Sequence, residues 1–573
     1  MPLMVRIILI MQIVISAAVW YFVMRYNMHM FQLNSYKNME QMRWLRRNYK
    51  REGVLVIPFI LGTATGIYPV IPVSVIFLMI HAFVLYYFIF LRRYHNKKRL
   101  VFTTRVIRMI LTDAVLSVII TDAIALGICF ALLYADGTFI DVIKGGGNLW
   151  ESRELTALLA GEVMGLCTVT IFQPFIIMLA NLINRPVEKL VAQYYINDAK
   201  KILRSNPNLT IIGITGSFGK TSVKYYLNTL LSSKYDVLMT PGNYNTTLGI
   251  TKTVRSSLKS SHEIFICEMG ARYVGDIKDI CKLVRPDHCI VTAVGPQHLD
   301  TFGGIDKVCD TKFELVDSVT SEGKGGIILL NGDNEYIRKR ATHYNDVTFY
   351  DTKEFADSTF YAKDIKVSQL GSEFTFVVNE TAGSTERAKK DASGKGNAEG
   401  RFTTRLVGLH NIINIVGAMG MAYRMGMTLD EMKIPVRRLA SVPHRMEMKD
   451  HGDVTIIDDA YNSNPVGSKA AVETLAMFDG CRILVTPGMV ELGKDEEEYN
   501  YRFGTYAAKA CDYIALVGEK HTAPIYKGII DSGFESSRVQ VFSKVGEAID
   551  YAYAIKAEGH KYILLENDLP DNY

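Results

Sequence analysis

Hydrophobic residues are unevenly spread along the chain, and its two parts predict different kinds of structure. Before about residue 184 the apolar runs are long, near the length of about twenty residues that a helix needs to cross a bilayer. After that point they are short, rich in β-branched residues and separated by amphipathic stretches. Short apolar strands that alternate with helices are typical of a doubly wound, mostly parallel sheet. The pattern therefore predicts an α-helical membrane domain followed by α/β domains.

The N-terminal part predicts about five membrane-spanning helices. The expected spans are Leu3 to Met24, two helices within Val54 to Leu91, about Met109 to Tyr134, and about Leu155 to Ile183. Gly66, Pro69 and Pro72 interrupt the second run and predict a tight turn there. Basic residues concentrate in the loops after the first and third spans, whereas the loop after the fourth is mostly acidic. Because positive loops stay in the cytoplasm, we expect a multi-pass topology with the N-terminus outside and the α/β domains inside.

Three acidic residues, Asp113, Asp122 and Glu162, fall within the expected spans. Carboxylates inside a bilayer mark either a functional contact or a hydrogen bond between helices. Asp113 lies near the basic edge of its span, where a snorkelling position or a pair with Arg108 would explain it. For Asp122 and Glu162, both a headgroup or partner contact and a structural hydrogen bond stay open. The basic loops would also attract anionic headgroups, so membrane lipid is an expected partner.

Net charge and cysteine spacing argue against nucleic-acid binding, a zinc ribbon and a thioredoxin-type motif. The 573 residues carry 64 Lys and Arg against 59 Asp and Glu, and a net charge of +5 is too small to indicate a nucleic-acid partner. None of the eight cysteines forms a CxxC pair, which excludes a zinc ribbon and a thioredoxin-type motif. Reduced, buried thiols in a cytosolic setting are expected.

Three domains are expected: a transmembrane domain at 1–184, a central domain at 196–443 and a C-terminal domain at 446–573. The segment Ser441 to Arg445 is placed as the boundary between the last two. Residues 360–378 alternate like a β-hairpin, and residues 380–400 are poor in apolar side chains, which predicts a flexible loop. The central domain is predicted as a P-loop, ATPase-like doubly wound fold, and the C-terminal domain as a Rossmann-like fold.

The segment Thr215 to Ser222 carries the clearest chemical signal. It joins an apolar strand to a helix and reads Thr-Gly-Ser-Phe-Gly-Lys-Thr-Ser. Glycines let backbone N–H groups approach a phosphate, and the start of a helix adds a partial positive charge. Lys220 is expected to reach the β- and γ-phosphates of a nucleotide, and Thr221 to hold Mg²⁺. The spacing departs from the general motif, since Ile214 stands where the first glycine is usual.

Two further polar residues follow neighbouring strands. Glu268 ends one apolar strand, and His298 comes after the next. Since the carboxyl ends of parallel strands face one crevice, both side chains are candidates to orient a second divalent ion beside the phosphate loop. Lys312 lies on the expected next helix, where the residues around it do not distinguish it from a solvated lysine.

Taken together, these segments resemble the Mur ligase family, the ATP-dependent amide-bond ligases of peptidoglycan synthesis. The resemblance covers about residues 196–573, and its specificity comes from the order and spacing of many short motifs. They are Thr215 to Thr221, Gly242 to Asn245, Glu268 to Ala271, His298-Leu299, Thr311 to Glu314, Asn331 to Asp333, Gly408 to Asn414, His444-Arg445, Asp459 to Pro465 and Gly488 to Gly493.

The resemblance implies a role for each matching residue. The phosphates of ATP would contact Gly216, Ser217, Gly219, Lys220, Thr221 and Ser222. The adenine and ribose side would contact Asn331, His410, Asn411 and Asn414, and the last domain would close over ATP with Arg445, Asp459, Tyr461 and Asn462. Magnesium ions would bind Thr221, Glu268, His298 and a carbamylated Lys312. The catalytic set would be Lys220, His298, Lys312 and Arg445, and the carboxylate substrate would face Asn243, Asn245 and Thr246.

The resemblance also implies a reaction and a place for it. A muropeptide carboxylate would attack ATP in the presence of Mg²⁺ to give an acyl phosphate, and the amine of an amino acid or of a D-Ala-D-Ala type dipeptide would then displace phosphate. The enzyme would work at a bacterial cell membrane. Membrane helices stand where the family usually has a UDP-binding domain, so a lipid-linked muropeptide is considered beside the UDP-linked one.

Some positions depart from the family pattern and leave the amine open. Thr246-Thr247 replaces a second Asn and an acidic residue that the dipeptide-adding members usually have, and Asn500 stands where His is common. Other interpretations are a membrane ligase for another envelope polymer such as poly-γ-glutamate, a transport or regulatory ATPase, and a non-catalytic scaffold. An amidating ligase is disfavoured, because its four-cysteine zinc insertion is missing from this sequence.

Overall fold

The computed structural model describes residues 2–52, 56–57, 59–60, 71–91, 99–135, 153–321, 323, 325–380, 397–461 and 463–568. The chain forms two compact units, which divide between Ala192 and Gln193. Most of the second expected span, the turn at Gly66 and Pro69, and most of the expected flexible loop at 380–400 lie outside the described residues.

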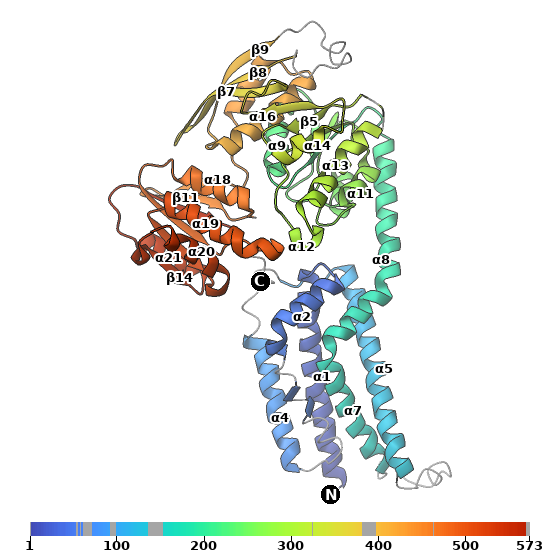
Figure 1. The fold of residues 1–573 in the computed structure, drawn as a ribbon. Coiled ribbons are helices and arrows are strands. Elements are labelled where there is room, and N and C mark those ends of the chain that lie inside the picture. The colour runs from blue at the N-terminus through green and yellow to red at the C-terminus, as the bar shows by residue number, and fades with distance from the viewer. Residues whose placement is uncertain are drawn as a thin grey trace. The chain divides into compact units, whose positions relative to one another are not determined.

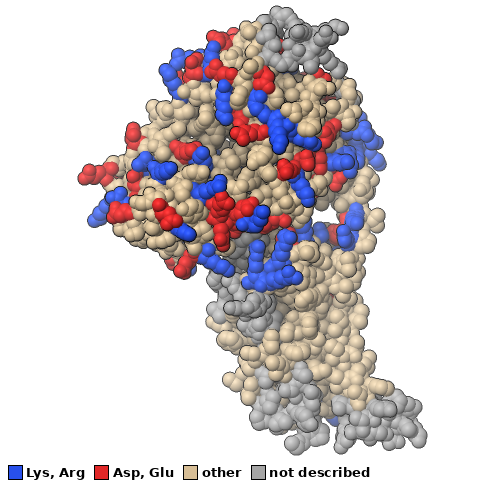
Figure 2. Space-filling view, viewed as in Figure 1, with Lys and Arg blue, Asp and Glu red and all other residues tan. Residues whose placement is uncertain are grey.

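The first unit is helical (Figure 1). Its helices are α1 (Pro2–Leu33), α2 (Asn38–Glu52), α4 (Ile71–Tyr86) with a π-helical turn at Tyr87–Leu91, α5 (Thr104–Ala135), α7 (Arg153–Ile171) and α8 (Gln173–Arg204), which continues into the second unit. Helix α7 packs against both α1 and α5, and α4 packs against α1. Uncharged side chains cover most of this unit's visible surface, as Figure 2 shows.

Two helices of the described part are long and apolar enough to cross a membrane, at Leu3–Leu33 and Thr104–Ala131. A third span is reached only if α7 and α8 count as one, and these two helices meet at an angle of 76°. Pro174 lies directly after the break, where a proline cannot continue the hydrogen bonds of the preceding helix. The expected span from Leu155 to Ile183 is therefore two helices, and the count of five spans stays a prediction.

The expected acidic residues of this unit make hydrogen bonds between helices. Asp113 accepts two hydrogen bonds of 2.8 Å from the Gln173 amide. Its expected partner Arg108 instead pairs with Glu188 at 2.7 Å, so the predicted Asp113–Arg108 pair is wrong. Asp122 and Glu162 share a side-chain hydrogen bond between α5 and α7, which favours the structural alternative for both.

The contact between α5 and α7 is close because glycines line it. A Cβ atom on Gly161 would lie 2.5 Å from the Cα atom of Ala125, and one on Gly165 would lie 2.8 Å from the Cα atom of Thr121. Small residues at this spacing let two helix backbones approach in an apolar environment. Gly161 and Gly165 therefore give α5 and α7 the close contact that is typical of helices packed inside a membrane.

The second unit begins with a nine-stranded sheet in the order β2-β3-β1-β4-β5-β6-β7-β8-β9. Its strands are β1 (Thr210–Thr215), β2 (Val237–Met239), β3 (Ile264–Glu268), β4 (His288–Val291), β5 (Ile328–Asn331), β6 (Thr348–Asp351), β7 (Ser358–Ser368), β8 (Gly371–Val378) and β9 (Ala398–Thr404). The strands from β2 to β7 pair in parallel, and β7, β8 and β9 pair antiparallel, which confirms the expected hairpin.

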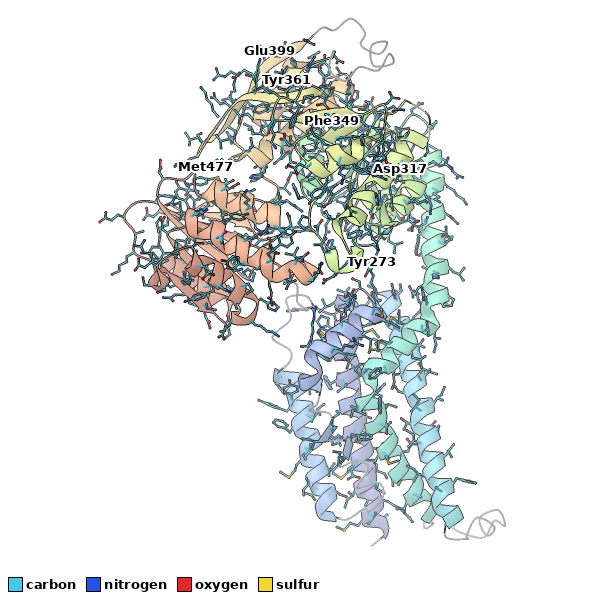
Figure 3. The ribbon with its side chains drawn as sticks, viewed as in Figure 1. Tyr273, Asp317, Phe349, Tyr361, Glu399 and Met477 are labelled. Carbon is cyan, nitrogen blue, oxygen red and sulfur yellow. The ribbon has the colours of Figure 1, made fainter. Side chains whose placement is uncertain are left out.

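Helices cover both faces of this sheet and bury two separate apolar cores. They are α9 (Lys220–Leu231), α10 (Thr247–Ser257), α11 (Asp276–Val284), α12 (Leu299–Phe302), α13 (Ile305–Ser321), α14 (Glu335–Ala341), α16 (Leu409–Arg424) and α17 (Leu429–Arg437). One core includes side chains of α9 and α16, and the other includes side chains of α11 and α13. Figure 3 labels Asp317 on α13 and Tyr273 in the loop after β3. The predicted doubly wound fold is confirmed.

A second sheet of six strands forms the C-terminal domain, in the order β10-β11-β15-β12-β13-β14. Its strands are β10 (Glu447–Asp450), β11 (Val454–Asp459), β12 (Cys481–Thr486), β13 (Tyr513–Val517), β14 (Val539–Phe542) and β15 (Lys561–Glu566). Its helices are α18 (Pro465–Leu475), α19 (Glu496–Ala510), α20 (Glu519–Asp531) and α21 (Val545–Ala554), with single 3-10 turns at Gly493–Asp495 and Ser536–Arg538. All strands but the edge strand β10 pair in parallel, as a Rossmann-like domain requires.

Candidate active site

The phosphate loop lies between the buried strand β1 and helix α9, as the sequence predicts. Gly216 and Gly219 have φ angles of 154° and 82°. A Cβ atom on Gly216 would lie 2.1 Å from Thr292 Oγ1, and one on Gly219 would lie 2.6 Å from Asn414 Oδ1. Both glycines are therefore required by close approach as well as by backbone conformation. The free N–H groups at the start of α9 give this loop its affinity for anions.

Lys220 begins α9, and its ammonium group folds back over the loop. It donates to the carbonyl oxygens of Gly216 at 2.6 Å and Ser217 at 3.2 Å. Burial and the positive charge of Arg445 lower the pKa of Lys220 to about 8, although Glu268 opposes the change. The lysine is thus still mostly charged at neutral pH and able to pair with a phosphate.

The two serines of the loop differ in what they contact. The Ser217 hydroxyl donates to the Gly295 carbonyl at 3.0 Å and accepts from the Gly295 N–H at 3.1 Å. Ser217 therefore fastens the phosphate loop to the segment after β4. Ser222 is buried on the first turn of α9, where it hydrogen-bonds Tyr226. Their expected phosphate contacts stay predictions.

Thr221 and Glu268 meet beside the phosphate loop. Thr221 Oγ1 donates to Glu268 Oε1 at 3.1 Å, and Asn245 donates to the same oxygen at 3.2 Å. Lys224 pairs with the other oxygen, Oε2, at 2.9 Å. Burial alone would raise the pKa of Glu268, but the ammonium groups of Lys224 and Lys220 outweigh it, and the pKa lies below its usual value. Glu268 is thus a buried, ionised carboxylate.

This pair suits a magnesium ion. The ion prefers oxygen ligands and commonly takes one or two from the protein, with phosphate oxygens supplying others. A threonine hydroxyl and an ionised carboxylate oxygen, 3.1 Å apart and next to the start of α9, form such a set. Mg²⁺ held by Thr221 and Glu268 would neutralise phosphate charge beside Lys220.

Lys312 is almost fully buried on α13, which the sequence did not predict. Burial and the charge of Lys220 lower the pKa of Lys312 to about 7, although Asp276 and Glu314 act in the opposite direction. An amine with this pKa is partly neutral at neutral pH, and only the neutral amine can react with carbon dioxide. Its carbamylation stays a prediction.

His298 contacts a residue of the other domain. It has a φ angle of 52° and precedes α12. Its Nδ1 atom hydrogen-bonds Glu491 Oε2 at 2.6 Å, and Arg272 donates to Glu491 Oε1 at 2.6 Å. Burial would raise the pKa of Glu491, but His298 and Arg272 outweigh it and lower it. His298 thus links the central and C-terminal domains, and its role as a metal ligand stays a prediction.

The residues expected on the nucleoside side gather around the start of α16 and the end of β5. Asn331 donates to the Thr292 carbonyl at 2.7 Å, and Asn414 lies against Gly219. Asn411 accepts a hydrogen bond of 2.8 Å from Tyr226 on α9. Burial lowers the pKa of His410 to about 4, so its imidazole is neutral. The structure brings Asn331 and Asn414 to the phosphate loop and its neighbouring strand end.

The expected C-terminal residues are partly placed. Arg445 lies over the Tyr461 ring, with its guanidinium carbon 4.9 Å from the ring centre. Asp459 ends β11 and accepts a hydrogen bond from the Met446 N–H at 3.1 Å. Burial and the charge of Glu566 raise the pKa of Asp459 to about 7. Asn462 lies outside the described residues.

The three residues expected to face the substrate have separate settings. Asn245 contacts Glu268, and its carbonyl accepts from the Gly270 N–H at 2.7 Å. Asn243 is exposed on the same loop. Thr246 caps α10, its hydroxyl accepting from the Gly249 N–H at 3.3 Å. Only Asn245 of the three reaches the expected metal site.

Two residues of this site were missed by the sequence analysis. Lys224 stands four positions after Lys220, a spacing that places two side chains on one face of a helix. That spacing could have identified it. Glu491 was included only within a longer motif, and its pairing with His298 joins residues 193 positions apart, for which no local signal exists.

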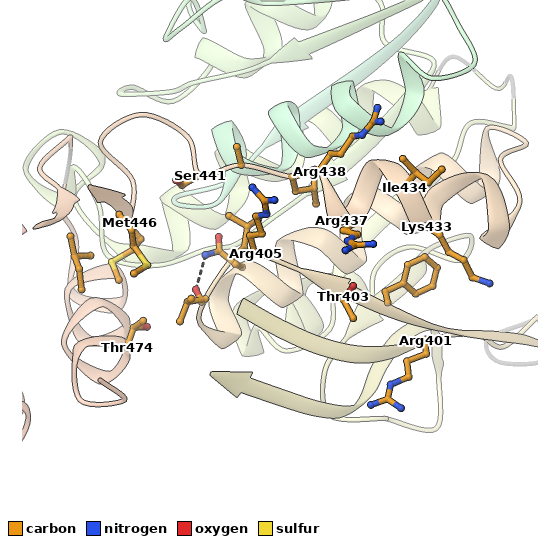
Figure 4. Close-up of a pocket in the computed structure, with 18 of the residues that line it drawn as sticks. Arg401, Thr403, Arg405, Lys433, Ile434, Arg437, Arg438, Ser441, Met446 and Thr474 are labelled. Atoms are coloured by element: carbon orange, nitrogen blue, oxygen red, sulfur yellow. Dashed lines mark hydrogen bonds between the residues drawn. The ribbon is translucent and has the colours of Figure 1, made fainter. Parts of the chain in front are cut away.

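A cavity of about 920 Å³ lies where β9, α17 and the following segment face the C-terminal domain (Figure 4). Five basic side chains and no acidic ones are among its lining residues: Arg401, Arg405, Lys433, Arg437 and Arg438. Asn411 also lines it. Arg401 and Lys433 are neutralised by Glu373 and Asp430, each at 2.7 Å.

Known proteins share both α/β domains. Residues 214–422 match the Mur ligase middle domain, and residues 444–566 match the Mur ligase glutamate ligase domain. The UDP-N-acetylmuramoyl-tripeptide–D-alanyl-D-alanine ligase of Escherichia coli K12 is 29% identical over 355 residues, 60% of this chain and 74% of the relative. Its counterpart in Bacillus subtilis 168 is 26% identical over 358 residues, 61% and 71% of the two chains.

Solved structures agree with these matches. MurF from Acinetobacter baumannii has a TM-score of 0.57 at 21% identity and covers 67% of this chain and 78% of its own, which shows the shared fold. MurF from Thermotoga maritima, solved in complex with ADP, has a TM-score of 0.55 at 25% identity, with coverages of 66% and 80%. The two domain matches span more than half of the 573 residues. The chain therefore belongs to the Mur ligase family of ATP-dependent, ADP-forming ligases.

Proposed function

We propose that this protein is a membrane-anchored ligase that adds an amino acid or a dipeptide of the D-Ala-D-Ala type to a peptidoglycan precursor. The observation that carries the proposal is the buried Thr221–Glu268 pair at the start of α9, directly beside Lys220. The names of the E. coli and B. subtilis relatives supply the substrate class, a UDP-linked muramoyl tripeptide and D-alanyl-D-alanine. The helices at Leu3–Leu33 and Thr104–Ala131 support a membrane location.

The reaction has two steps, formation of an acyl phosphate and its aminolysis. A carboxylate oxygen of the muropeptide attacks the γ-phosphorus of ATP, the bond to the β,γ-bridging oxygen breaks, and an acyl phosphate and ADP form. The amine then attacks the acyl carbon through a tetrahedral intermediate. Phosphate leaves with the former carboxylate oxygen, and the amine loses a proton.

The residues of the central domain stabilise the first step. Lys220 would leave the carbonyl oxygens of Gly216 and Ser217 and pair with the phosphate that is transferred. Bound Mg²⁺, held by Thr221 and Glu268, would supply charge neutralisation at the phosphates. Asn245 contacts Glu268, which supports the expectation that its loop would bring the carboxylate of the substrate to the same site.

The C-terminal domain would complete the site by closing over ATP. The positive charge of Arg445 contributes to the lowered pKa of Lys220, which supports its expected role in closing over ATP. His298, Arg272 and Glu491 form a cross-domain contact that favours the closed arrangement. Exclusion of water matters because water would hydrolyse the acyl phosphate.

The test is amide formation by the detergent-solubilised full chain. With ATP, Mg²⁺, UDP-linked muramoyl tripeptide and D-alanyl-D-alanine, we expect ADP release that equals the yield of a pentapeptide product measured by mass spectrometry. Lys220→Ala should abolish ADP release and product formation. Lys282→Met should change neither of these, because Lys282 is exposed. ADP release without any new C–N bond, across a panel of amino acids and dipeptides, would refute the ligase.

A second arm asks how the muropeptide is carried. We propose that a lipid-linked muropeptide is used as well, because the apolar helices would hold the catalytic domains near a bilayer. In mixed micelles the lipid-linked form is expected to turn over faster than the UDP-linked form at equal concentration. Equal or better use of the UDP-linked form removes the lipid-linked substrate and leaves the ligase intact.

A further inference from the structure

Lys224 is a fully buried lysine that the reaction described above does not use. It lies one turn after Lys220 on α9, and its side chain has no exposed surface. Its ammonium group pairs with Glu268 Oε2 at 2.9 Å and donates to the Gly242 carbonyl at 2.7 Å. A buried charge is costly unless it is paired and hydrogen-bonded, so these two contacts decide where the side chain lies.

The two oxygens of Glu268 have different neighbours because of this lysine. Oε1 accepts from Thr221 and from Asn245, at 3.1 and 3.2 Å. Oε2 faces Lys224. The lysine therefore fixes the rotation of the carboxylate and keeps Oε1 beside Thr221, the two oxygens that the proposed function assigns to the cation.

The second contact of Lys224 reaches the loop that carries the expected substrate residues. Gly242 begins the segment Gly-Asn-Tyr-Asn that ends at Asn245. Asn245 in turn contacts Glu268. Lys224, Gly242, Asn245 and Glu268 therefore form a closed set of contacts that joins the start of this loop, its end and the carboxylate.

We propose that Lys224 is a positioning residue that couples the orientation of the metal-binding carboxylate of Glu268 to the position of the loop from Gly242 to Asn245. The inference rests on the proposed function, in which Thr221 and Glu268 hold Mg²⁺. Lys224 touches neither phosphate nor metal in this arrangement and acts through its neighbours. Loss of the lysine would let the carboxylate rotate and would release the loop at Gly242.

The coupling predicts two effects that a general loss of structure would not separate. Partners that orient a metal ligand typically contribute about 10-fold to 100-fold to metal affinity. Lys224→Met should weaken the binding of Mn²⁺, used as a paramagnetic substitute for Mg²⁺, by about that factor in the presence of ADP. It should also raise the KM for the muropeptide carboxylate. The affinity for ADP without metal should stay within about twofold, because the phosphate loop itself is unchanged.

The experiment uses the full chain in detergent. Free Mn²⁺ is counted by electron paramagnetic resonance at saturating ADP, and ADP binding in the presence of EDTA is measured by calorimetry. Lys234→Met is the matched control, since Lys234 lies just after the same helix and its ion pair with Glu431, at 3.1 Å, is exposed. If Lys224→Met does not purify as a folded chain, Lys224→Gln replaces it, because its amide still donates to Gly242.

The outcomes separate the inference from the proposed function. A selective loss of Mn²⁺ affinity together with a raised muropeptide KM supports the coupling. Unchanged Mn²⁺ affinity in a folded variant overturns it, and so does an equal loss of metal-free ADP affinity, which would indicate general damage to the site. If the unaltered chain binds no Mn²⁺ with ADP, the metal site of the proposed function fails, and the coupling fails with it.

Discussion

Replacing Lys312 with methionine should stabilise the central domain at neutral pH. Lys312 has about 2% of its surface exposed, and its pKa falls from 10.5 to about 7. Each pH unit between a folded and an unfolded pKa corresponds to about 1.4 kcal/mol, so burial of the charged form costs on the order of 5 kcal/mol. Methionine has a similar unbranched shape and carries no charge, so it avoids this cost.

The pH dependence makes the expectation specific. Between pH 7 and 10.5 the unfolded chain binds more protons at Lys312 than the folded chain does, so the free energy of unfolding rises with pH in this window. Because about half of the folded chains have already lost this proton at pH 7, the destabilisation caused by Lys312 is about 4 kcal/mol at pH 7 and about 2 kcal/mol at pH 9. The stability advantage of Lys312→Met should therefore shrink by about 2 kcal/mol between pH 7 and pH 9.

Pulse proteolysis of the full chain in increasing urea, at pH 7 and at pH 9, measures the free energy of unfolding of the domain that contains α13. Lys282→Met is the control, since Lys282 is largely exposed and pairs with Asp279 on the surface. If Lys312→Met does not raise the free energy of unfolding, or raises it equally at pH 7 and pH 9, Lys312 is not a buried and partly neutral amine.

The remaining predictions concern activity. Lys312→Ala should abolish amide formation, and short-chain carboxylic acids should restore part of it if a carbamate normally binds metal there; full activity without added acid would contradict the metal role. Gly219→Ala should weaken ADP binding at least 10-fold by calorimetry, since its Cβ would meet Asn414 Oδ1 at 2.6 Å at a φ angle of 82°; unchanged binding would mean that the loop relaxes. Glu491→Gln should lower kcat more than the affinity for ADP, because it weakens the contact with His298 across the domains; equal kcat would exclude that contact from closure.

Local sequence determined much of the fold and of the phosphate site. The strand before Thr215, the glycines and the lysine that follow, and the carboxylate at the end of β3 all stand where their patterns predict. These features depend on short-range rules, namely strand periodicity, the conformational needs of glycine and the geometry of a helix start. The burial of Lys312 could not be predicted in the same way, because it depends on which parts of the fold pack against α13.

The sequence by itself therefore determined the α/β architecture, the phosphate loop and the residue types around it. The tertiary structure decided which side chains meet: Lys224 with Glu268 and Gly242, His298 with Glu491, and Asp113 with Gln173 instead of Arg108. It also divided the expected last span into two helices at an angle of 76°. The physical reason is the range of the interactions, since hydrophobic period and backbone propensity act over a few residues, whereas a buried charge is paired by whichever residue the fold brings beside it.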